Sequence, residues 1–318
     1  MCENSEIGEP EFFTVDQQTA NQRIDCILAE KYSEIRSRSY FQYLIANDYV
    51  LINGNKIKKQ HKPKEGDIVE VTFVLTPELN LTPENIPLDV IYEDPYLLAI
   101  NKPPGMVVHP ASGHWSGTFV NAFLYHCRNS SMDLSSENAR PGIVHRLDKD
   151  TSGILLAAKD QLTQQKLSEI FSLRKIQKEY FAVCCGNPGT GEIRVPIGRH
   201  PYERKLMCVR TEGGRDAETH YTTLACDGKI SLVKIKLITG RTHQIRVHMK
   251  HLGTPVLGDA LYGNLQNNKK YKASRQLLHA GILSFCHPIT QENIKLTAPF
   301  PDDIKKYFTM FELDDIPM

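Results

Sequence analysis

Two aspartates, Asp148 and Asp150, lie in residues 145–153, whose sequence is HRLDKDTSG. Bulky apolar residues precede Asp148, and small hydroxylic residues follow the pair. A carboxylate in such a segment can serve as a nucleophile, as an acid or base, or as a metal ligand. The segment suits an enzyme that needs a buried, ionised carboxylate beside its substrate.

Two interpretations of the aspartate pair come from the pattern alone. A calcium-binding EF-hand loop would place oxygen ligands at Asp148 and Asp150, but its twelfth position, which requires a bidentate glutamate, is Lys159. A haloacid-dehalogenase-type phosphatase would use the first aspartate to attack phosphorus and the second as acid and base. The preceding PGIVHRLD contains His145 and Arg146 where that fold has an unbroken buried strand, and no later acidic pair is suited to magnesium. Calcium is therefore disfavoured, and the phosphatase remains an alternative.

The composition limits the class of protein. The 318 residues are 41% hydrophobic with a net charge of +1, which predicts one large core with a smaller satellite domain. The eight cysteines include no C-x-x-C pair, so reduced thiols in a cytoplasmic protein are expected. The acidic first residues do not resemble a signal peptide, and no apolar run approaches the roughly 20 residues that a membrane span needs.

Residues 17–75 predict a small ααβ domain. Apolar residues recur at helical spacing around residues 24–28 and 41–45, with Ser37 or Ser39 as the N-cap of the second helix, and Asn53-Gly54 predicts a β-hairpin turn. Between residues 35 and 64, Asp48 is the one acidic residue among seven basic residues: Arg36, Arg38, Lys56, Lys58, Lys59, Lys62 and Lys64. Such a face is either a solvated surface or a site that attracts phosphates.

Residues 76–89 are polar, contain three prolines and predict a linker. Residues 90–312 then contain many short β-prone runs and a few amphipathic helical stretches, without regular alternation of strand and helix. This order predicts an α+β fold with a mixed, largely antiparallel sheet.

Longer motifs resemble known families. RIDCILAEKY followed by SRSYFQYLIANDYVLINGNKIKK resembles the S4 RNA-binding domain. GIVHRLDKDTSGILLAAKD resembles the central motif of the RluA-type pseudouridine synthases, and INKPPGMVVHP, KEYFAVCCG, LITGRTHQIRVHMKHLGTPVLGD and LLHAGILSFCHP resemble the other core segments of that family. The resemblance covers the chain from Arg23 to about Phe300.

The resemblance implies an enzyme that isomerises specific uridines in RNA to pseudouridine, as in the members that act on 23S rRNA of the large subunit. The uridine must leave the base stack before its N1–C1′ bond breaks and a C5–C1′ bond forms. The family motifs imply that Asp148 acts at the ribose, that Arg246 pairs with it, and that Tyr180 stacks on the uracil and helps remove the C5 proton. Attack at C1′ and proton removal from C2′ remain equally open for Asp148.

Further residues are candidates for substrate binding. Arg146 resembles the family arginine that steadies the flipped nucleotide, with an ordinary ion pair as the alternative, and Tyr180 could instead be a core tyrosine. Residues 240–253 predict a basic helix with Thr242 as N-cap and Gly253 as C-terminal stop, which could also be an ordinary surface helix. Candidate substrate ligands near its start are Arg241, His243 and Gln244.

The partner and cofactor predictions follow from the resemblance. We expect RNA as substrate, in large-subunit rRNA or a pre-50S particle, no membrane association, a monomer, no cofactor and no metal. A non-catalytic RNA-binding or ribosome-assembly protein remains the alternative from a different class.

Overall fold

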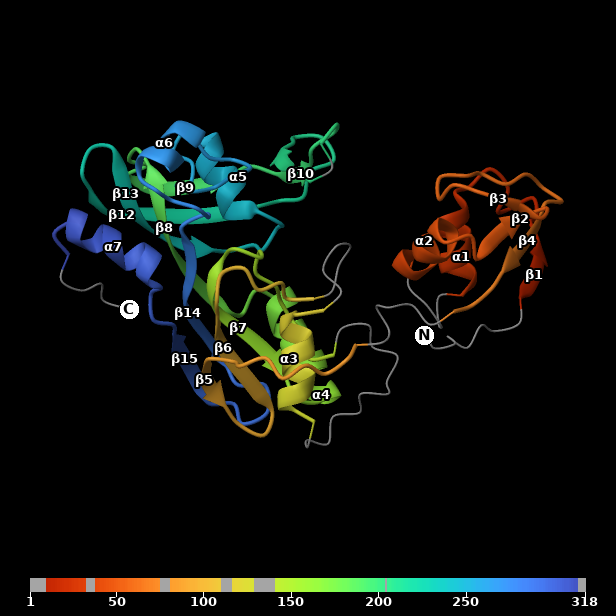
Figure 1. Cartoon of the computed structure of the whole chain (residues 1–318), viewed down its shortest axis with the longest axis horizontal. Coiled ribbons are helices and arrows are strands. Elements are labelled where there is room, and N and C mark those ends of the chain that lie inside the picture. The colour runs from red at the N-terminus through yellow and green to blue at the C-terminus, as the bar shows by residue number, and fades with distance from the viewer. Residues whose placement is uncertain are drawn as a thin grey trace. The chain divides into compact units, whose positions relative to one another are not determined.

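The computed structural model describes residues 10–32, 38–74, 81–109, 116–128, 141–203 and 205–313. The chain forms two compact units, Met1–Leu81 and Thr82–Met318 (Figure 1). The first contains two helices and a small sheet, and the second contains the long sheet that carries the aspartate motif.

The first unit has the expected two helices and hairpin. Its helices are α1 (Ile24–Lys31) and α2 (Arg38–Ala46), and its sheet has the order β1-β4-β2-β3. The strands are β1 (Glu11–Thr14), β2 (Val50–Ile52), β3 (Asn55–Lys56) and β4 (Ile68–Val71). Apolar side chains of both helices pack on this sheet in one core.

Two details of this unit refine the predictions. Asn53 and Gly54 have φ angles of 50° and 74°, and positive φ at both positions is what a tight hairpin turn of this kind requires. Ser39 lies inside α2 and is not its N-cap, whereas Ser37 lies outside the described residues. Strand β1 precedes the expected start at residue 17 and pairs with β4.

The second unit is built on a nine-stranded sheet with the order β5-β6-β7-β14-β8-β13-β12-β9, and β15 pairs with β14. The pair β7–β14 is parallel and the other described pairs of this sheet are antiparallel, which confirms the predicted mixed, largely antiparallel fold. The strands are β5 (Val90–Glu93), β6 (Leu97–Lys102), β7 (Ser152–Ala158), β8 (Gln177–Cys185), β9 (Thr190–Arg194), β12 (Glu218–Cys226), β13 (Ile230–Leu237), β14 (Leu278–Cys286) and β15 (Asn293–Thr297).

Helices cover both faces of this sheet. Successive strand residues point to opposite faces, so buried strands present apolar side chains to helices on each side. Leu98 and Leu155 face the core that contains α3 (Phe119–His126) and α5 (Gln244–His251). Their neighbours in sequence, such as Leu97 and Leu156, face the core that contains α4 (Gln161–Ser172), and Phe181 on β8 faces the core that contains α7 (Asp302–Met310). A separate hairpin, β10 (Ile197–Arg199) and β11 (Met207–Val209), and the short helix α6 (Leu265–Lys270) complete the described elements.

The predicted linker is partly packed. Residues 76–80 of it lie among the undescribed residues 75–80, but the backbone N–H of Glu84 donates to the carbonyl of Asn121, and the Asn121 amide donates to the carbonyl of Thr82. These bonds attach the segment after residue 81 to helix α3. None of the described helices is both long and apolar enough to cross a membrane.

Candidate active site

The segment that carries the two aspartates connects a coil to strand β7 and is held by its backbone. The buried ammonium of Lys102 donates to three carbonyl oxygens, those of Pro103, Met106 and Lys149, at 2.9, 3.0 and 2.9 Å. The guanidinium of Arg275 donates to the carbonyl of Asp150 at 2.8 Å. The backbone of the two residues that follow Asp148 is therefore held by two different side chains.

Burial governs the charge on Lys102. Loss of solvent lowers the pKa of this ammonium to about 7, although the charges of Asp150 and Asp148 act in the opposite sense. Its three carbonyl acceptors supply the hydrogen bonds that a buried ammonium requires.

The rest of the motif joins the segment to the sheet. Gly153 has φ +107°, and a Cβ there would lie 2.2 Å from the carbonyl oxygen of Ala280, so glycine is required where β7 meets β14. The hydroxyl of Ser152 lies 3.0 Å from Nδ1 of His279. His145 accepts a hydrogen bond from the backbone N–H of Leu156 at 2.9 Å through Nε2.

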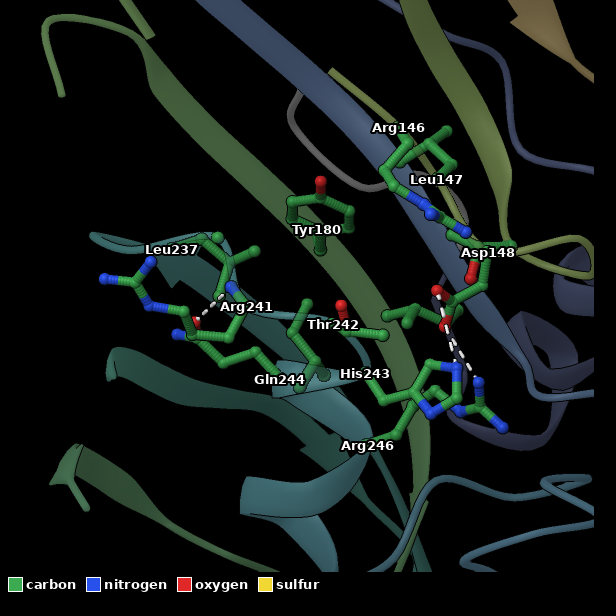
Figure 2. Close-up of a pocket in the computed structure, with 14 residues that line it drawn as sticks. Arg146, Leu147, Asp148, Tyr180, Leu237, Arg241, Thr242, His243, Gln244 and Arg246 are labelled. Carbon is green, nitrogen blue, oxygen red and sulfur yellow. Dashed lines mark hydrogen bonds and ion pairs between the residues drawn. The ribbon is translucent and has the colours of Figure 1, made fainter. Parts of the chain in front are cut away.

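Asp148 pairs with Arg246, as the resemblance implied. Nη1 of Arg246, on α5, donates to Oδ2 of Asp148 at 2.8 Å, while its Nε and Nη2 donate to the two oxygens of Asp259 at 2.6 and 3.0 Å (Figure 2 shows the Asp148 side). Burial opposes the charge on this guanidinium, but its bonds and attraction to Asp259 and Asp148 raise its pKa above the usual value. Arg246 thus presents a fixed positive charge to Asp148.

Asp259 is the member of this group that sequence reasoning missed. Its side chain is fully buried, and Oδ1 also accepts hydrogen bonds from the backbone N–H groups of Leu261 and Tyr262 at 2.9 and 3.0 Å. Asp259 is the last residue of the LITGRTHQIRVHMKHLGTPVLGD motif, and its place in that motif is the sequence feature that could have identified it as a site residue.

The pocket beside Asp148 is formed by residues 146–151, strand β8 and the segment before α5. Its lining residues are Arg146, Leu147, Asp148, Thr151, Tyr180, Leu237, Gly240, Arg241, Thr242, His243, Gln244, Ile245, Arg246 and Leu278 (Figure 2). The structure therefore brings together all seven residues that the sequence predicted for catalysis and substrate binding. The buried hydroxyl of Thr151 also lines the pocket and has no hydrogen-bond partner among the described residues.

Tyr180 extends from strand β8 toward the same pocket (Figure 2). Burial, together with the negative charge of Asp148, raises its pKa well above the usual value of a phenol. The side chain therefore presents a flat aromatic ring with a protonated hydroxyl group.

His243 lies at the start of α5 with a left-handed backbone, φ 57°, and is the N-cap residue in place of the predicted Thr242. Its Nδ1 lies 2.8 Å from the hydroxyl of Tyr262, and its Nε2 lies 3.9 Å from Oδ1 of Asp148. Burial lowers the pKa of His243, although the Asp148 charge opposes this. At the other end of α5, Gly253 has φ 76° and follows the C-cap Leu252, as predicted.

Three predicted substrate ligands differ in the number of contacts that their side chains make within the protein. Arg146 is exposed, reaches over the pocket (Figure 2), and makes no ion pair with the described residues. Arg241 donates through Nε to the carbonyl of Asp216 at 2.9 Å. The Gln244 amide makes four hydrogen bonds within the protein, including one to the backbone N–H of Arg241 at 2.9 Å, so its geometry suits positioning of this segment.

The predicted RNA-binding residues of the first unit are not equivalent. Arg36 lies outside the described residues. Arg38 pairs with the fully buried Asp25 at 3.0 Å, and Lys56 pairs with Asp48 at 2.6 Å. Lys58 and Lys59 are exposed and make no ion pair within the described part of the chain, so they have the most freely available charges.

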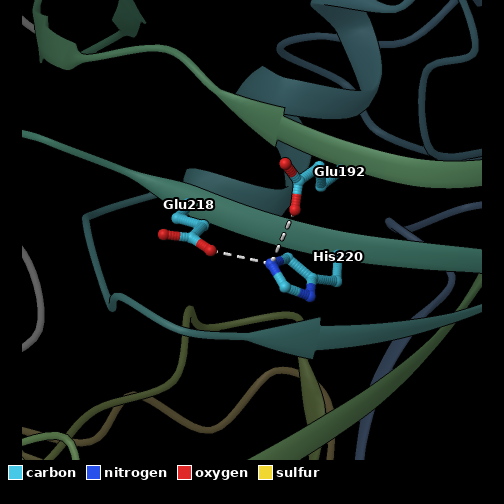
Figure 3. Close-up of side chains that lie close together, drawn as sticks. All are labelled: Glu192, Glu218 and His220. Carbon is cyan, nitrogen blue, oxygen red and sulfur yellow. Dashed lines mark hydrogen bonds and ion pairs between the residues drawn. The ribbon is translucent and has the colours of Figure 1, made fainter.

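One group of side chains away from the pocket has the spacing of metal ligands. Glu192, Glu218 and His220 lie on the neighbouring strands β9 and β12 (Figure 3). Nη2 of Arg194 lies 3.2 Å from carboxylate oxygens of both glutamates, so a cation already balances their charge. We therefore interpret the group as a surface ion-pair network.

Comparisons with known proteins agree with this geometry. The family model described as RNA pseudouridylate synthase matches residues 96–251, which include the aspartate motif, Tyr180 and α5. The solved structure titled Human RNA Pseudouridylate Synthase Domain Containing 4 has a TM-score of 0.56 and 25% sequence identity, and the match covers 72% of this chain and 94% of that one.

Relatives match over nearly the full length. An uncharacterised RNA pseudouridine synthase of Bacillus subtilis is 41% identical over 295 residues, which cover 92% of this chain and 94% of the relative. The ribosomal large subunit pseudouridine synthase D of Xanthomonas campestris is 39% identical over 313 residues, covering 94% and 92%. The chain therefore belongs to the family of RNA pseudouridine synthases, which decides against the phosphatase and calcium interpretations of its aspartate motif.

Proposed function

We propose that this RNA pseudouridine synthase modifies uridines in large-subunit ribosomal RNA and that Asp148 is its reacting carboxylate. The observation that carries the second part is the 2.8 Å ion pair between Asp148 and Arg246 in a pocket bounded by the aromatic ring of Tyr180. Support for the rRNA target comes from relatives of 38–39% identity named ribosomal large subunit pseudouridine synthase D in several bacteria.

The chemistry of the site follows from its charges. Asp148 must be ionised both to attack C1′ and to remove a proton from C2′. The guanidinium of Arg246 lies 2.8 Å from Oδ2 of Asp148 and places a permanent positive charge beside this carboxylate. Tyr180 stacks on the flipped uracil, and its hydroxyl takes part in removing the C5 proton as a relay, because a neutral phenol that accepts this proton must release its own.

The remaining contacts with RNA are divided between the two units. The unpaired Arg146 at the mouth of the pocket steadies the flipped nucleotide, and Arg241, His243 and the hydroxyl of Thr151 offer further hydrogen bonds to it. The first unit is an S4 RNA-binding domain that contacts RNA phosphates through a basic surface including Lys58 and Lys59. The enzyme acts as a monomer on rRNA or on pre-50S particles.

Asp148→Asn tests the proposal. The variant should lose pseudouridine formation in a large-subunit rRNA transcript by on the order of 10⁴-fold, because the amide is a poor nucleophile and base. Asp150→Asn is the matched control, because it also removes one negative charge. Asp150 lies two residues from Asp148, and its side chain makes no hydrogen bond with the described residues. Pseudouridine is mapped by chemical labelling and primer extension. Activity of Asp148→Asn equal to that of the control contradicts the role of Asp148, and binding without any modification by the wild type contradicts the rRNA target.

A further inference from the structure

A second cavity adjoins the pocket of Asp148. The two share five lining residues: Arg146, Tyr180, Leu237, Gly240 and Arg241. The second cavity extends from there toward the end of α4 and the start of β8, where its other lining residues are Val144, His145, Phe171, Ser172, Arg174, Lys178, Ile238 and Thr239. The two cavities are therefore adjacent and are bounded in part by the same side chains.

The second cavity is lined by positive charge without compensation. Four of its lining residues are cations, namely Arg146, Arg174, Lys178 and Arg241, and none of the described residues that line it is an aspartate or glutamate. His145 adds no charge, because burial lowers its pKa to about 3, with Lys178 acting in the same direction. Several cations in a concave, half-enclosed site focus a positive potential that attracts anions.

Lys178 differs from the exposed arginines of this group, Arg146 and Arg174, because it is partly buried and still has no hydrogen-bond or ion-pair partner among the described residues. Nζ lies 3.8 Å from the position that a Cβ on Gly240 would occupy, so it faces the segment that lines both cavities. Burial, and then the charge of Arg174, lower its pKa. A bound anion would supply the missing partner and favour the charged form.

The place of Lys178 on strand β8 relates it to the substrate. Lys178 and Tyr180 are two residues apart, so their side chains leave the same face of the strand about 7 Å apart. Tyr180 lines the pocket proposed for the flipped uridine, and the phosphates attached to that nucleoside lie within such a span. Arg174 approaches the same cavity from the turn after α4, where it has a left-handed backbone with φ 58°.

We propose that Lys178 and Arg174 bind one backbone phosphate next to the flipped uridine, so that this cavity holds the RNA strand while the base occupies the pocket of Asp148. The inference rests on the proposed function, because the ligand is the substrate RNA itself. It assigns substrate contacts to two residues that the sequence motifs did not single out for binding.

The test compares Lys178→Gln and Arg174→Gln with Lys175→Gln in the full-length enzyme. Lys175 is exposed, lies next to Arg174, does not line the cavity and makes no described ion pair, so its variant is the matched loss of charge. We expect Lys178→Gln to raise KM for an rRNA transcript by about 10-fold in 0.1 M KCl, with kcat nearly unchanged. Lys175→Gln should leave both constants near wild type.

Salt dependence gives a second readout. Each phosphate contact with a single strand contributes about 0.7 to the slope of log affinity against log salt concentration. Lys178→Gln and Arg174→Gln should each reduce the slope by up to this amount. Because both residues bind the same phosphate, the double variant should lose about 0.7 in total and not about 1.4.

Three outcomes would overturn the proposal. These are a KM and slope for Lys178→Gln equal to those of Lys175→Gln, a loss of kcat without a change in KM, and a slope loss near 1.4 for the double variant. The same substitutions made in Asp148→Asn, with affinity for the transcript measured by filter binding, keep the test separate from catalysis. If the wild type forms no pseudouridine but the binding effects appear, the proposed function fails while the phosphate site stands.

Discussion

Asp148 and Arg246 are 98 positions apart in sequence, and their side chains meet at 2.8 Å in the candidate active site. The other two nitrogens of the guanidinium donate to Asp259, which is fully buried. Arg246 therefore joins the partly exposed carboxylate that we propose to react, that of Asp148, to the fully buried carboxylate of Asp259. The two hydrogen bonds to Asp259 hold the guanidinium in place and so fix the position of the positive charge beside Asp148.

Arg246→Lys should lower kcat by about 10²-fold or more, because an ammonium cannot make the two parallel bonds to Asp259 and also reach Asp148. Kinetics of pseudouridine formation in an rRNA transcript measure the effect. Asp259→Asn provides the companion variant: it keeps Arg246 but loosens its orientation, and it should also reduce the free energy of unfolding by about 3 kcal/mol. If Arg246→Lys kept the wild-type kcat, a positive charge beside Asp148 would be sufficient for catalysis without the planar guanidinium.

Tyr180→Phe should lower kcat by about 10²-fold while KM stays close to wild type, since the ring is kept and only the hydroxyl is lost. Burial and Asp148 raise the Tyr180 pKa, so the phenol stays protonated at neutral and mildly alkaline pH. The wild-type kcat should accordingly show no ionisation of Tyr180 between pH 7 and 9. Release of tritium from 5-tritiated uridine in RNA measures both quantities. An unchanged kcat in the variant would leave stacking as the function of this residue.

His145→Gln should make stability less sensitive to acid. The pKa of His145 is about 3 in the folded protein, below the ordinary value of 6.5. Between these values the unfolded chain binds a proton that the folded protein excludes, so stability falls as the pH drops below 6.5. His145 accounts for on the order of 1–2 kcal/mol of the loss between pH 7 and pH 5. Urea unfolding at both pH values measures it, and an equal loss in the variant would contradict the assignment.

Gly153→Ala should unfold the second unit or destabilise it by more than about 3 kcal/mol, because a methyl group would overlap the carbonyl of Ala280 and φ is +107°. Gly105→Ala is the matched control. It also has a positive φ, +88°, but no atom lies within 4 Å of its added Cβ, so a loss of about 1–2 kcal/mol is expected. Urea denaturation distinguishes the two, and equal losses would mean that backbone conformation alone matters.

Much of the fold could be predicted where local signals are strong. The Asn53-Gly54 turn, the helices near residues 24 and 41 and the strands around Tyr180 follow from side-chain periodicity and turn chemistry, and they are present. The start of α5 was misplaced by one residue. Thr242 has the better capping side chain, but the left-handed backbone of His243 places the helix start after it.

The site was predicted as a set of motifs and not as a geometry. Family resemblance paired Arg246 with Asp148, and the structure places them in contact. No local pattern indicates that Asp259 fixes Arg246 or that Lys102 collects three carbonyls, because these contacts depend on how distant segments pack. The lack of a partner for the Lys178 ammonium likewise becomes apparent only from the positions of the surrounding side chains in the fold.

The parallel pairing of β7 with β14 has a consequence for synthesis of the chain. Ser152 meets His279, and Arg275 holds the carbonyl of Asp150, so the residues that support the aspartate motif lie more than 120 positions after it in the sequence. Since chains emerge from the ribosome amino end first, the pocket cannot take its final form until β14 has emerged. A nascent chain that already contains Asp148, Tyr180 and Arg246 but not yet β14 should therefore be inactive in modifying RNA.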